Sequence, residues 1–165
     1  RLKLTLNAKD LPLAAKKLKS SGLAEPLLEE VKKGKPVLGI CLGMQLLFTR
    51  SFEFGEHEGL NLIPGSVRYI GEVIPKELKI PQIGWNSLKS GAKRGESSII
   101  KNEGEYVYFV HSYAAFCDEK FITATTNYGA DLTAAVQNKN VHGVQFHPEK
   151  SGNVGLNILR AFCEA

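Results

Sequence analysis

The feature that most constrains the fold is the stretch of residues 36–48, PVLGICLGMQLLF, in which one cysteine lies between two glycines. Its apolar residues 36–40 predict a short buried strand, and residues 42–48 predict the first two turns of a helix. Cys41 therefore falls on the strand-to-helix turn, in a G-x-C-x-G pattern that matches the G-x-S-x-G nucleophile elbow with sulfur in place of oxygen. Glycines suit this turn because its backbone is sharp, and larger side chains would collide with the neighbouring strand and helix.

Two interpretations of Cys41 are open at this point. A cysteine at a helix N-terminus experiences a partial positive charge, which lowers the thiol pKa and favours the reactive thiolate. Cysteine is also among the residues that are most often buried for packing alone. The stretch by itself does not decide between a nucleophile and a structural residue.

A second motif lies far downstream, where residues 142–150 read HGVQFHPEK. A cysteine nucleophile needs a base that takes and returns its proton, and that base needs a third group to fix its tautomer. Pro148 stops the preceding strand, and in an extended chain His147 and Glu149 point the same way because they are two residues apart. Together with the elbow, this segment predicts a catalytic triad of Cys41, His147 and Glu149.

Four further segments carry a more specific pattern: EFGEHEGLNLIPGSV (53–67), PQIGWNSL (81–88), YVYFVHSYAA (106–115) and GLNILRAF (155–162). With the G-x-C-x-G-x-Q and H-P-E motifs, the chain resembles the class I, triad-type glutamine amidotransferases. Within that class it resembles the glutaminase subunits of imidazole glycerol phosphate synthases, which belong to histidine biosynthesis. The resemblance extends from about residue 13 to the last residue, so we expect one amidotransferase domain over residues 1–165.

The resemblance implies an α/β fold of three layers, flavodoxin-like, with a central, mostly parallel sheet and added antiparallel strands. The residue pattern agrees, because strands interleaved with helices indicate an α/β sheet and consecutive short strands in the second half indicate antiparallel pairs. We expect two helical pieces within residues 13–33, the second starting near Pro26, and a closing helix from about Asn153. Further strands are expected at 66–70, 82–88, 106–110, 121–126, 133–137 and 142–146, and a polar loop at 91–104 with a weak strand or turn at 98–100.

The resemblance also implies the reaction, which is hydrolysis of the side-chain amide of glutamine. Cys41 would attack the carbonyl carbon and expel ammonia, and water would then cleave the glutamyl thioester. His147 would carry the proton in both halves of the reaction, held by Glu149. The backbone N–H of Leu42 would donate to the oxyanion, as the residue after the nucleophile does in an elbow.

Three residues are expected to hold the substrate. Gln45 lies one helical turn beyond Cys41 on the same face and helps to bind glutamine in the family. The backbone around Ser112 and Tyr113 would bind the amino acid end of glutamine. Without the motif, Gln45 would read equally well as an exposed polar helix residue, and His111 reads as a structural histidine at a strand edge.

Free ammonia would be protonated in water and lost, and the family avoids this by docking on a (β/α)₈-barrel cyclase subunit. We therefore expect a heterodimer in which this chain passes ammonia to that partner. Trp85 is the only tryptophan of the chain, and with Asn86 it belongs to the segment PQIGWN. The family counterpart of Trp85 lies at the cyclase interface, and tryptophan is enriched at interface hot spots. A tryptophan buried in the core is the alternative.

Composition excludes several other classes of protein. The content of 43% hydrophobic and 23% charged residues is ordinary for a soluble globular protein, and no apolar run approaches the roughly 18 residues of a membrane span. The three cysteines, Cys41, Cys117 and Cys163, lack C-x-x-C spacing, so we expect no disulfide framework, no metal site, no cofactor and a cytoplasmic location. The net charge of +4 comes from scattered lysines without interleaved aromatic residues, so no nucleic-acid partner is expected.

The N-terminus departs from the family pattern. The family begins with a βαβ unit of at least roughly 30 residues, and a P-G-V-G loop after a following strand contributes to the oxyanion site. Here only RLKLTLNAKDLP precedes the first helix, with leucines alternating from Leu2 to Leu6 as in a strand and Asn7 to Asp10 where the glycines should stand. Either segments are missing from this sequence, or the protein has lost part of its sheet and of its oxyanion site. We expect missing segments, because the loss of a core strand would expose apolar surface on its neighbours.

Two alternative functions remain. The chain could be a catalytically silent subunit that only binds the barrel, or the glutaminase of a different synthase. Retention of Cys41, Gln45, His147 and Glu149 argues against the silent subunit, because such a protein has no chemical reason to keep all four.

Overall fold

A computed structural model describes residues 10–93, 98–101 and 103–164 of the chain. The expected strand from Leu2 to Leu6 and the residues that follow it to Lys9 lie outside the described residues. Helices are α1 (Leu11–Ser20), α2 (Ala24–Lys32), α3 (Leu42–Leu46) and α4 (Gly152–Glu164). Strands are β1 (Val37–Ile40), β2 (Phe48–Ser51), β3 (His57–Glu58), β4 (Ile63–Tyr69), β5 (Gln82–Ser90), β6 (Tyr106–His111), β7 (Tyr113–Cys117), β8 (Ile122–Asn127), β9 (Asp131–Asn138) and β10 (Val141–Val144), and the short 3₁₀ helices are η1 (Ile70–Glu72), η2 (Glu119–Phe121) and η3 (Pro148–Lys150).

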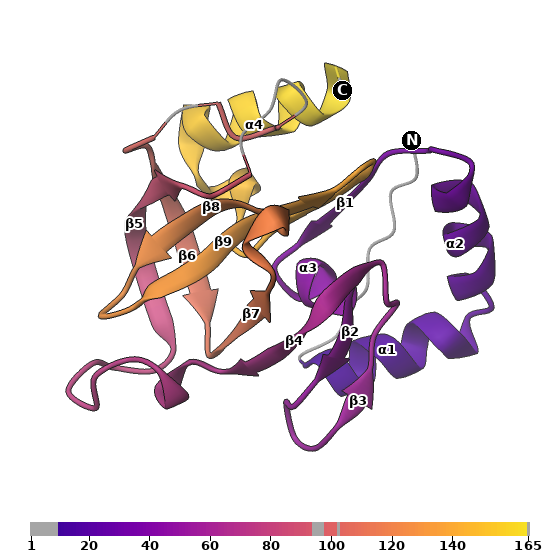
Figure 1. Cartoon of the computed structure of the whole chain (residues 1–165), viewed down its shortest axis with the longest axis horizontal. Coiled ribbons are helices and arrows are strands. Elements are labelled where there is room, and N and C mark those ends of the chain that lie inside the picture. Colours follow the sequence, from indigo (N-terminus) through magenta and orange to yellow (C-terminus); the bar gives the residue numbers. More distant parts are fainter. Residues whose placement is uncertain (1–9, 94–97, 102, 165) are drawn as a thin grey trace.

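The strands form two sheets that lie against each other in Figure 1. The larger sheet has six strands in the order β1-β10-β9-β8-β5-β6, and the smaller one has four in the order β3-β2-β4-β7. The described parallel pairings are β1 with β10 and β2 with β4, and the other described pairings are antiparallel. The expected α/β class with added antiparallel strands is confirmed. The expectation of a mostly parallel central sheet is wrong for the described strands, because antiparallel pairings outnumber parallel ones there.

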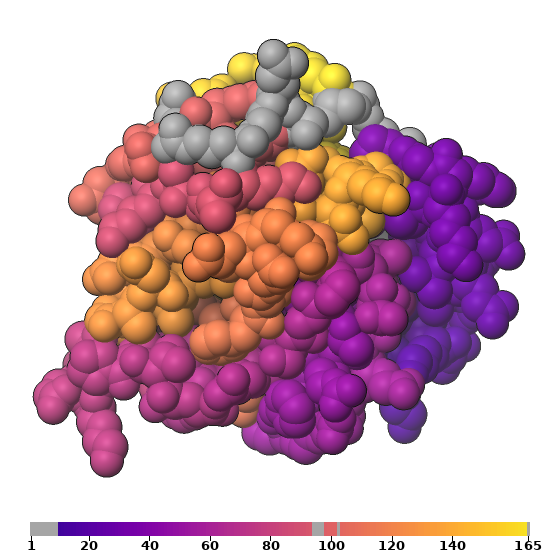
Figure 2. Space-filling view, viewed as in Figure 1, coloured from indigo at the N-terminus to yellow at the C-terminus, as the bar shows by residue number. Residues whose placement is uncertain are grey.

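The core has one part on each face of the six-stranded sheet. On one face α4 packs through Ile158 against residues such as Phe109 and Phe146, which belong to the same apolar cluster. On the other face β9 and β10 contact the elements around the nucleophile turn, where Met44 and Phe48 are fully buried. Figures 1 and 2 show α1 and α2 together on one side of the molecule and the strands β5 to β9 on the other.

The helix α1 covers the side of α3 away from the large sheet. Asp10 caps its N-terminus by accepting a hydrogen bond of 2.9 Å from the backbone N–H of Leu13. Leu11 and Ala14 are fully buried against Leu46 of α3, in the i, i+3 spacing of an apolar stripe. This contact packs α1 against α3, the helix that follows Cys41.

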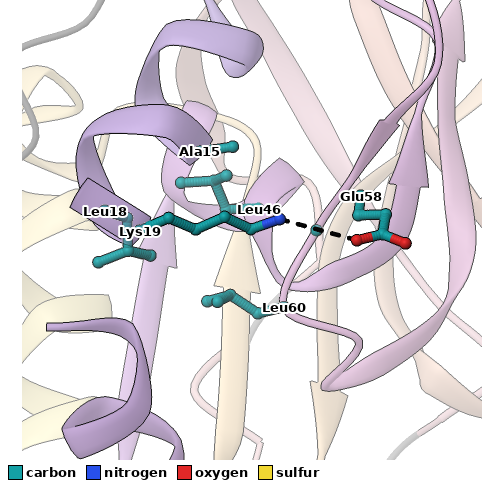
Figure 3. Close-up of a pocket in the computed structure, with 7 residues that line it drawn as sticks. Ala15, Leu18, Lys19, Leu46, Glu58 and Leu60 are labelled. Atoms are coloured by element: carbon teal, nitrogen blue, oxygen red, sulfur yellow. Dashed lines mark ion pairs between the residues drawn. The ribbon is translucent and has the colours of Figure 1, made fainter. Parts of the chain in front are cut away.

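A small pocket lies between α1 and the segment that follows β3 (Figure 3). Lys19 crosses it and forms an exposed ion pair of 3.7 Å with Glu58, above the apolar side chains of Leu46 and Leu60. Its volume of about 10 Å³ is close to what one water molecule needs. The pocket is therefore a packing gap and too small for an amino acid.

Most expected elements are present, with shifts at their ends. The helical pieces break around Gly22, which has φ of 70°, as expected from the Ser-Ser-Gly sequence. The expected helix over 42–48 is wrong at its end, because α3 stops at Leu46 and Phe48 begins β2, where it pairs with Ile63. Phe48 is fully buried there, so tertiary packing overrides the local helical pattern. No strand forms at residues 98–100 of the described loop.

Candidate active site

The nucleophile turn joins β1 to α3 at the edge of the large sheet. Cys41 has φ of 50° and ψ of −109°, a left-handed conformation that a residue with a side chain rarely adopts. Its backbone N–H donates to the carbonyl of Val144 on β10 at 2.8 Å, which fixes the turn against the neighbouring strand. The strained elbow that the G-x-C-x-G pattern predicts is confirmed.

The two glycines of the motif have different roles. A Cβ on Gly39 would lie 2.5 Å from the carbonyl oxygen of Gly43, so any side chain there would collide with the backbone of α3. A Cβ on Gly43 would meet no described atom within 4 Å. The expected steric need for glycine therefore holds for Gly39 and is wrong for Gly43.

The sulfur of Cys41 faces polar groups of three segments. The backbone N–H of Leu42 donates to it, the side-chain amide of Gln145 donates to it at 3.7 Å, and the carbonyl oxygen of Val110 lies at 4.0 Å. Burial raises the pKa of the Cys41 thiol, and the negative charge of Glu149 raises it further against the two donors. The thiolate expected from a helix N-terminus is thus not the favoured resting form, because burial outweighs the effect of a helix of only five residues.

The base and its orienting carboxylate are held together by a tight turn. Nδ1 of His147 lies 2.7 Å from Oε1 of Glu149, and the backbone between them belongs to η3. The extended geometry expected for this pair is wrong, although the contact itself forms. With Nδ1–H donating to Glu149, Nε2 is the ring nitrogen left to accept a proton.

Hydrogen bonds to β6 fix the position of this turn. The backbone N–H of His147 donates to the carbonyl of Tyr108 at 2.9 Å, and Oγ of Ser151 accepts from the N–H of Tyr108 at 3.0 Å. The Ser151 hydroxyl also donates to the carbonyl of His147 at 2.7 Å. The base is therefore attached to the same strand whose Val110 carbonyl faces Cys41.

We call the region around Cys41, His147 and Glu149 the corner. The substrate residues expected from sequence lie in it, and their polar groups already have hydrogen-bond partners within the chain. Gln45 is buried, so its interpretation as an exposed helix residue is wrong, and its Nε2 donates to the carbonyl of Tyr113 at 3.0 Å. The carbonyl of Ser112 accepts from the N–H of Ile70 at 3.0 Å. Contact of these residues with glutamine stays a prediction.

His111 links the corner to β5. It is buried, with Nδ1 at 2.8 Å from the Tyr113 carbonyl and Nε2 at 2.8 Å from Oε1 of Gln82. Burial and, to a smaller extent, the nearby His147 lower the pKa of His111 to about 4, against the hydrogen bond to the Tyr113 carbonyl, which raises it. These contacts support the structural role expected for this histidine.

Trp85 and Asn86 are neighbours in β5 and point to opposite faces of the strand, Trp85 outwards and Asn86 to the side of the buried Gln82. The Trp85 side chain is 52% exposed, so its alternative as a core residue is wrong. Its ring meets Tyr108 edge to face with centroids 6.0 Å apart, and Nζ of Lys150 lies 5.9 Å from the Tyr108 centroid. Asn86 accepts from Nε2 of Gln82 at 3.0 Å.

Two residues near Cys41 were not singled out from sequence. Gln145 contacts the sulfur as described above, and its only signal was its place in the GVQFHPEK motif. Glu53 is half-buried and accepts a hydrogen bond of 2.8 Å from the N–H of Leu11, and its charge raises the pKa of the Cys41 thiol. Burial raises the pKa of the Glu53 carboxyl. Its signal was its place in the EFGEHEGL segment, where neither spacing nor periodicity distinguished it from the neighbouring acids.

The described residues contain no group of three or more histidine, cysteine or acidic side chains that could hold a metal ion. Among the helices that the structure describes, none is both long and apolar enough to cross a membrane. Neither finding adds a further site to the corner around Cys41.

Comparison with known proteins places the chain in a family. Residues 16–165 match the class-I glutamine amidotransferase family. The imidazole glycerol phosphate synthase subunit HisH of Listeria monocytogenes is 46% identical over 153 residues, which cover 93% of this chain and 72% of the relative. The HisH subunit of Caldanaerobacter subterraneus is 50% identical over 154 residues, which cover 93% of this chain and 73% of the relative.

A solved structure agrees at the level of the fold. A crystal structure of a glutamine amidotransferase matches with a TM-score of 0.69 at 18% identity, covering 94% of this chain and 74% of that one. At this identity the match concerns the fold alone, and the family follows from the sequence matches. The chain belongs to the class-I glutamine amidotransferases and, within them, to the HisH subunits of imidazole glycerol phosphate synthase.

Proposed function

We propose that this chain hydrolyses glutamine to glutamate and ammonia, and that it supplies the ammonia to a cyclase subunit for the synthesis of imidazole glycerol phosphate. The observation that carries the proposal is the arrangement around Cys41. Cys41 has a strained backbone, and the N–H of Leu42 donates to its sulfur. Glu149 binds Nδ1 of His147 and is close enough for its charge to raise the thiol pKa of Cys41. This arrangement contains a nucleophile, an oxyanion donor and an oriented base. Those are the three parts that acyl transfer needs.

The first half of the reaction breaks the amide bond. Because the thiol pKa is raised, Cys41 starts protonated, and Nε2 of His147 takes the proton as sulfur attacks the amide carbon. The N–H of Leu42 stabilises the negative charge that develops on the carbonyl oxygen. His147 then gives its proton to the leaving nitrogen, so that ammonia departs and a glutamyl thioester remains.

The second half restores the enzyme. His147, now neutral again, takes a proton from water as that water attacks the thioester carbon. The carbon–sulfur bond breaks, the proton returns to sulfur and glutamate leaves. Glu149 keeps Nδ1 of His147 in the donor role throughout, which leaves Nε2 to transfer protons in both halves.

Glutamine itself carries an ammonium and a carboxylate that need partners. We assign the ammonium to the carboxylate of Glu53, which is half-buried and electrostatically coupled to both Cys41 and Tyr113. Gln45 retains Oε1 as an acceptor, since both of its described bonds use Nε2. Ser112 and Tyr113, at the β6–β7 corner, complete the contacts to the amino acid end.

The outer face of β5 and β6 is the proposed surface for a (β/α)₈-barrel cyclase. Ile83, Trp85 and Tyr106 are 61%, 52% and 59% exposed on neighbouring strands, so large apolar side chains gather on one face. Such clusters of aromatic residues are typical of protein interfaces. Lys150 flanks them as a polar group, whereas the side chain of Asn86 points to the opposite face of β5. The complex would be a heterodimer.

The reducing cytoplasm is the compartment that suits this chemistry. Cys41, Cys117 and Cys163 are all free. A nucleophilic thiol must stay reduced, and free cysteines persist where glutathione and thioredoxin keep thiols reduced.

Glutamate release by the chain in complex with its cyclase tests the proposal. Cys41→Ala should abolish it, whereas the matched control Cys117→Ala, at a half-buried cysteine of β7, should retain it. The same Cys41→Ala complex should still make imidazole glycerol phosphate when ammonia is supplied from solution. Glutamate release that survives Cys41→Ala would overturn the mechanism, and a wild-type complex without glutaminase activity would favour the silent subunit.

A further inference from the structure

Two buried side-chain amides lie behind Cys41, and the mechanism above does not use their N–H donors. Gln145 is fully buried directly after β10. Its Nε2 donates to the Cys41 sulfur at 3.7 Å, and its Oε1 accepts from Nε2 of Gln45 at 3.2 Å. Nε2 of Gln45 also donates to the Tyr113 carbonyl at 3.0 Å. Two buried side-chain amides and the backbone carbonyl of Tyr113 are thus linked in series to the nucleophile.

The direction of each amide follows from one fixed acceptor. A backbone carbonyl can only accept, so the group that Gln45 presents to Tyr113 must be its NH₂. The second hydrogen of that NH₂ points to Gln145, which must therefore present its oxygen. The NH₂ of Gln145 is then left for the Cys41 sulfur. A reversed Gln145 would set two NH₂ groups against each other and leave two buried donors unsatisfied.

The backbone holds this donor rigidly in place. The N–H of Gln145 donates to the carbonyl of Ala134 on β9 at 2.8 Å, and the N–H of Cys41 donates to the carbonyl of Val144 at 2.8 Å. Cys41 and Gln145 are therefore anchored to adjacent positions of the same sheet. The two backbones cannot move apart without breaking a sheet hydrogen bond.

We propose that Gln145 is a further catalytic residue, whose amide N–H stabilises the thiolate of Cys41 at the moment when His147 removes the thiol proton. An N–H donor bonds more strongly to a charged sulfur than to a neutral thiol, so it lowers the energy of the attacking form. The corner needs such a donor because burial and the charge of Glu149 both disfavour the thiolate. Gln45 then has a second role, since it orients the donor.

Alkylation of Cys41 by iodoacetamide as a function of pH tests this inference in the full chain. The thiolate displaces iodide and forms a carbon–sulfur bond, so the midpoint of the rate reports on the thiol pKa without any glutamine. Peptide mass spectrometry separates Cys41 from the other two cysteines. Although the inference rests on the proposed function for its meaning, this readout is independent of glutaminase activity, so either can fail alone.

Three variants separate the hydrogen bond from mere packing. Gln145→Met keeps the size of the side chain and removes the donor, and we expect alkylation at pH 7 to slow about tenfold, as for an increase of about one unit in the thiol pKa. Gln145→Glu places an acceptor and a negative charge against the sulfur and should slow it further. The matched control Gln137→Met, at a buried glutamine of β9 that faces away from Cys41, should leave the midpoint unchanged.

Thermal unfolding decides whether the variants are folded and comparable. Unchanged alkylation in a folded Gln145→Met protein, or an equal change in Gln137→Met, would overturn the inference. If Gln145→Met does not fold, the side-chain NH₂ signal of Gln145 in the ¹⁵N-labelled wild type takes its place. That signal should titrate with the same midpoint as Cys41 alkylation, and a signal that does not respond to the Cys41 titration would overturn the inference as well.

Discussion

The corner around Cys41 and the outer face of β5 and β6 differ in whether their side chains find their partners within the chain. In the corner, buried polar groups such as Gln45, Gln145 and His111 bond to one another and to the backbone. On the outer face, Trp85 and Ile83 present large apolar side chains to solvent. The contacts that hold the proposed catalytic residues thus lie within the chain, whereas the exposed apolar face suits the proposed partner.

This difference has a consequence for which variants affect which property. Groups in the corner should control chemistry and stability, because their contacts lie within the chain. Groups on the face should control affinity for the cyclase and leave thiol chemistry intact. Tyr108 and Lys150 lie between the two regions, since the Tyr108 ring meets Trp85 on one side and Lys150 next to the Glu149 turn on the other.

The largest effect is expected from His147→Gln. Without the base, the Cys41 proton has no acceptor held by Glu149, so glutamate release should fall by about 10²- to 10⁴-fold. The buried His142→Gln variant is the matched control, because its ring packs on Phe162 away from the corner. Loss of cyclase affinity in His147→Gln beyond about threefold would contradict the separation of the two regions.

Gly39→Ala should break the corner by a different route. The added Cβ would lie 2.5 Å from the Gly43 carbonyl oxygen and 2.7 Å from the backbone nitrogen of Met44, atoms that cannot move without unwinding α3. We expect the free energy of unfolding to fall by about 3 kcal/mol, at the upper end for overpacking. Chemical denaturation measures it, and Gly43→Ala, with open space at its Cβ, should lose much less. Equal losses in the two variants would show that the steric argument is wrong.

Local spacing explains why much of the corner could be predicted from sequence. The strand, the sharp turn and Cys41 occupy adjacent residues, and His147 and Glu149 are two apart, so one short pattern contains each part. The pattern did not give the conformation of the second part, because η3 rather than an extended strand brings Nδ1 of His147 to Glu149.

Contacts between distant residues explain what could not be predicted. Gln145 and Cys41 are separated by 104 residues and meet only because β1 pairs with β10. The direction of the Cys41 thiol pKa was wrong for the same reason, since burial depends on the assembled fold while the helix N-terminus is visible locally. Phe48 was likewise predicted in a helix but belongs to β2, where it is buried beside Ile63.

Trp85→Ala tests the outer face. Its exposed ring contacts Tyr108 alone among aromatic partners that the structure describes, so we expect the unfolding midpoint to stay unchanged. Affinity for the cyclase should fall by about 30-fold, equivalent to a hot spot of about 2 kcal/mol. Titration calorimetry measures it, with Leu156→Ala on α4, 55% exposed, as the matched control. Unchanged affinity for the cyclase would contradict the proposed interface. A change in the rate of Cys41 alkylation would contradict the separation of the corner from the face.

The smallest effect concerns His111, which lies between the two regions because it bonds to Tyr113 on one side and to Gln82 of β5 on the other. Burial lowers its pKa from 6.5 to about 4 in the folded chain. Its unfolded form therefore binds a proton first as pH falls, so its contribution to stability is complete above pH 6.5 and is lost progressively towards pH 4. Between pH 7.5 and pH 5 the loss in the free energy of unfolding is about 1–2 kcal/mol.

Chemical denaturation at the two pH values measures this loss. The free energy of unfolding should fall less for His111→Gln than for wild type, while His142, whose pKa is also lowered to about 4, contributes equally to both. Identical falls would show that His111 has the same pKa in the folded and unfolded chain. A larger fall for His111→Gln than for wild type would show that His111 is charged in the folded chain, with both ring nitrogens donating, so that a cation rather than a neutral ring joins the corner and the face.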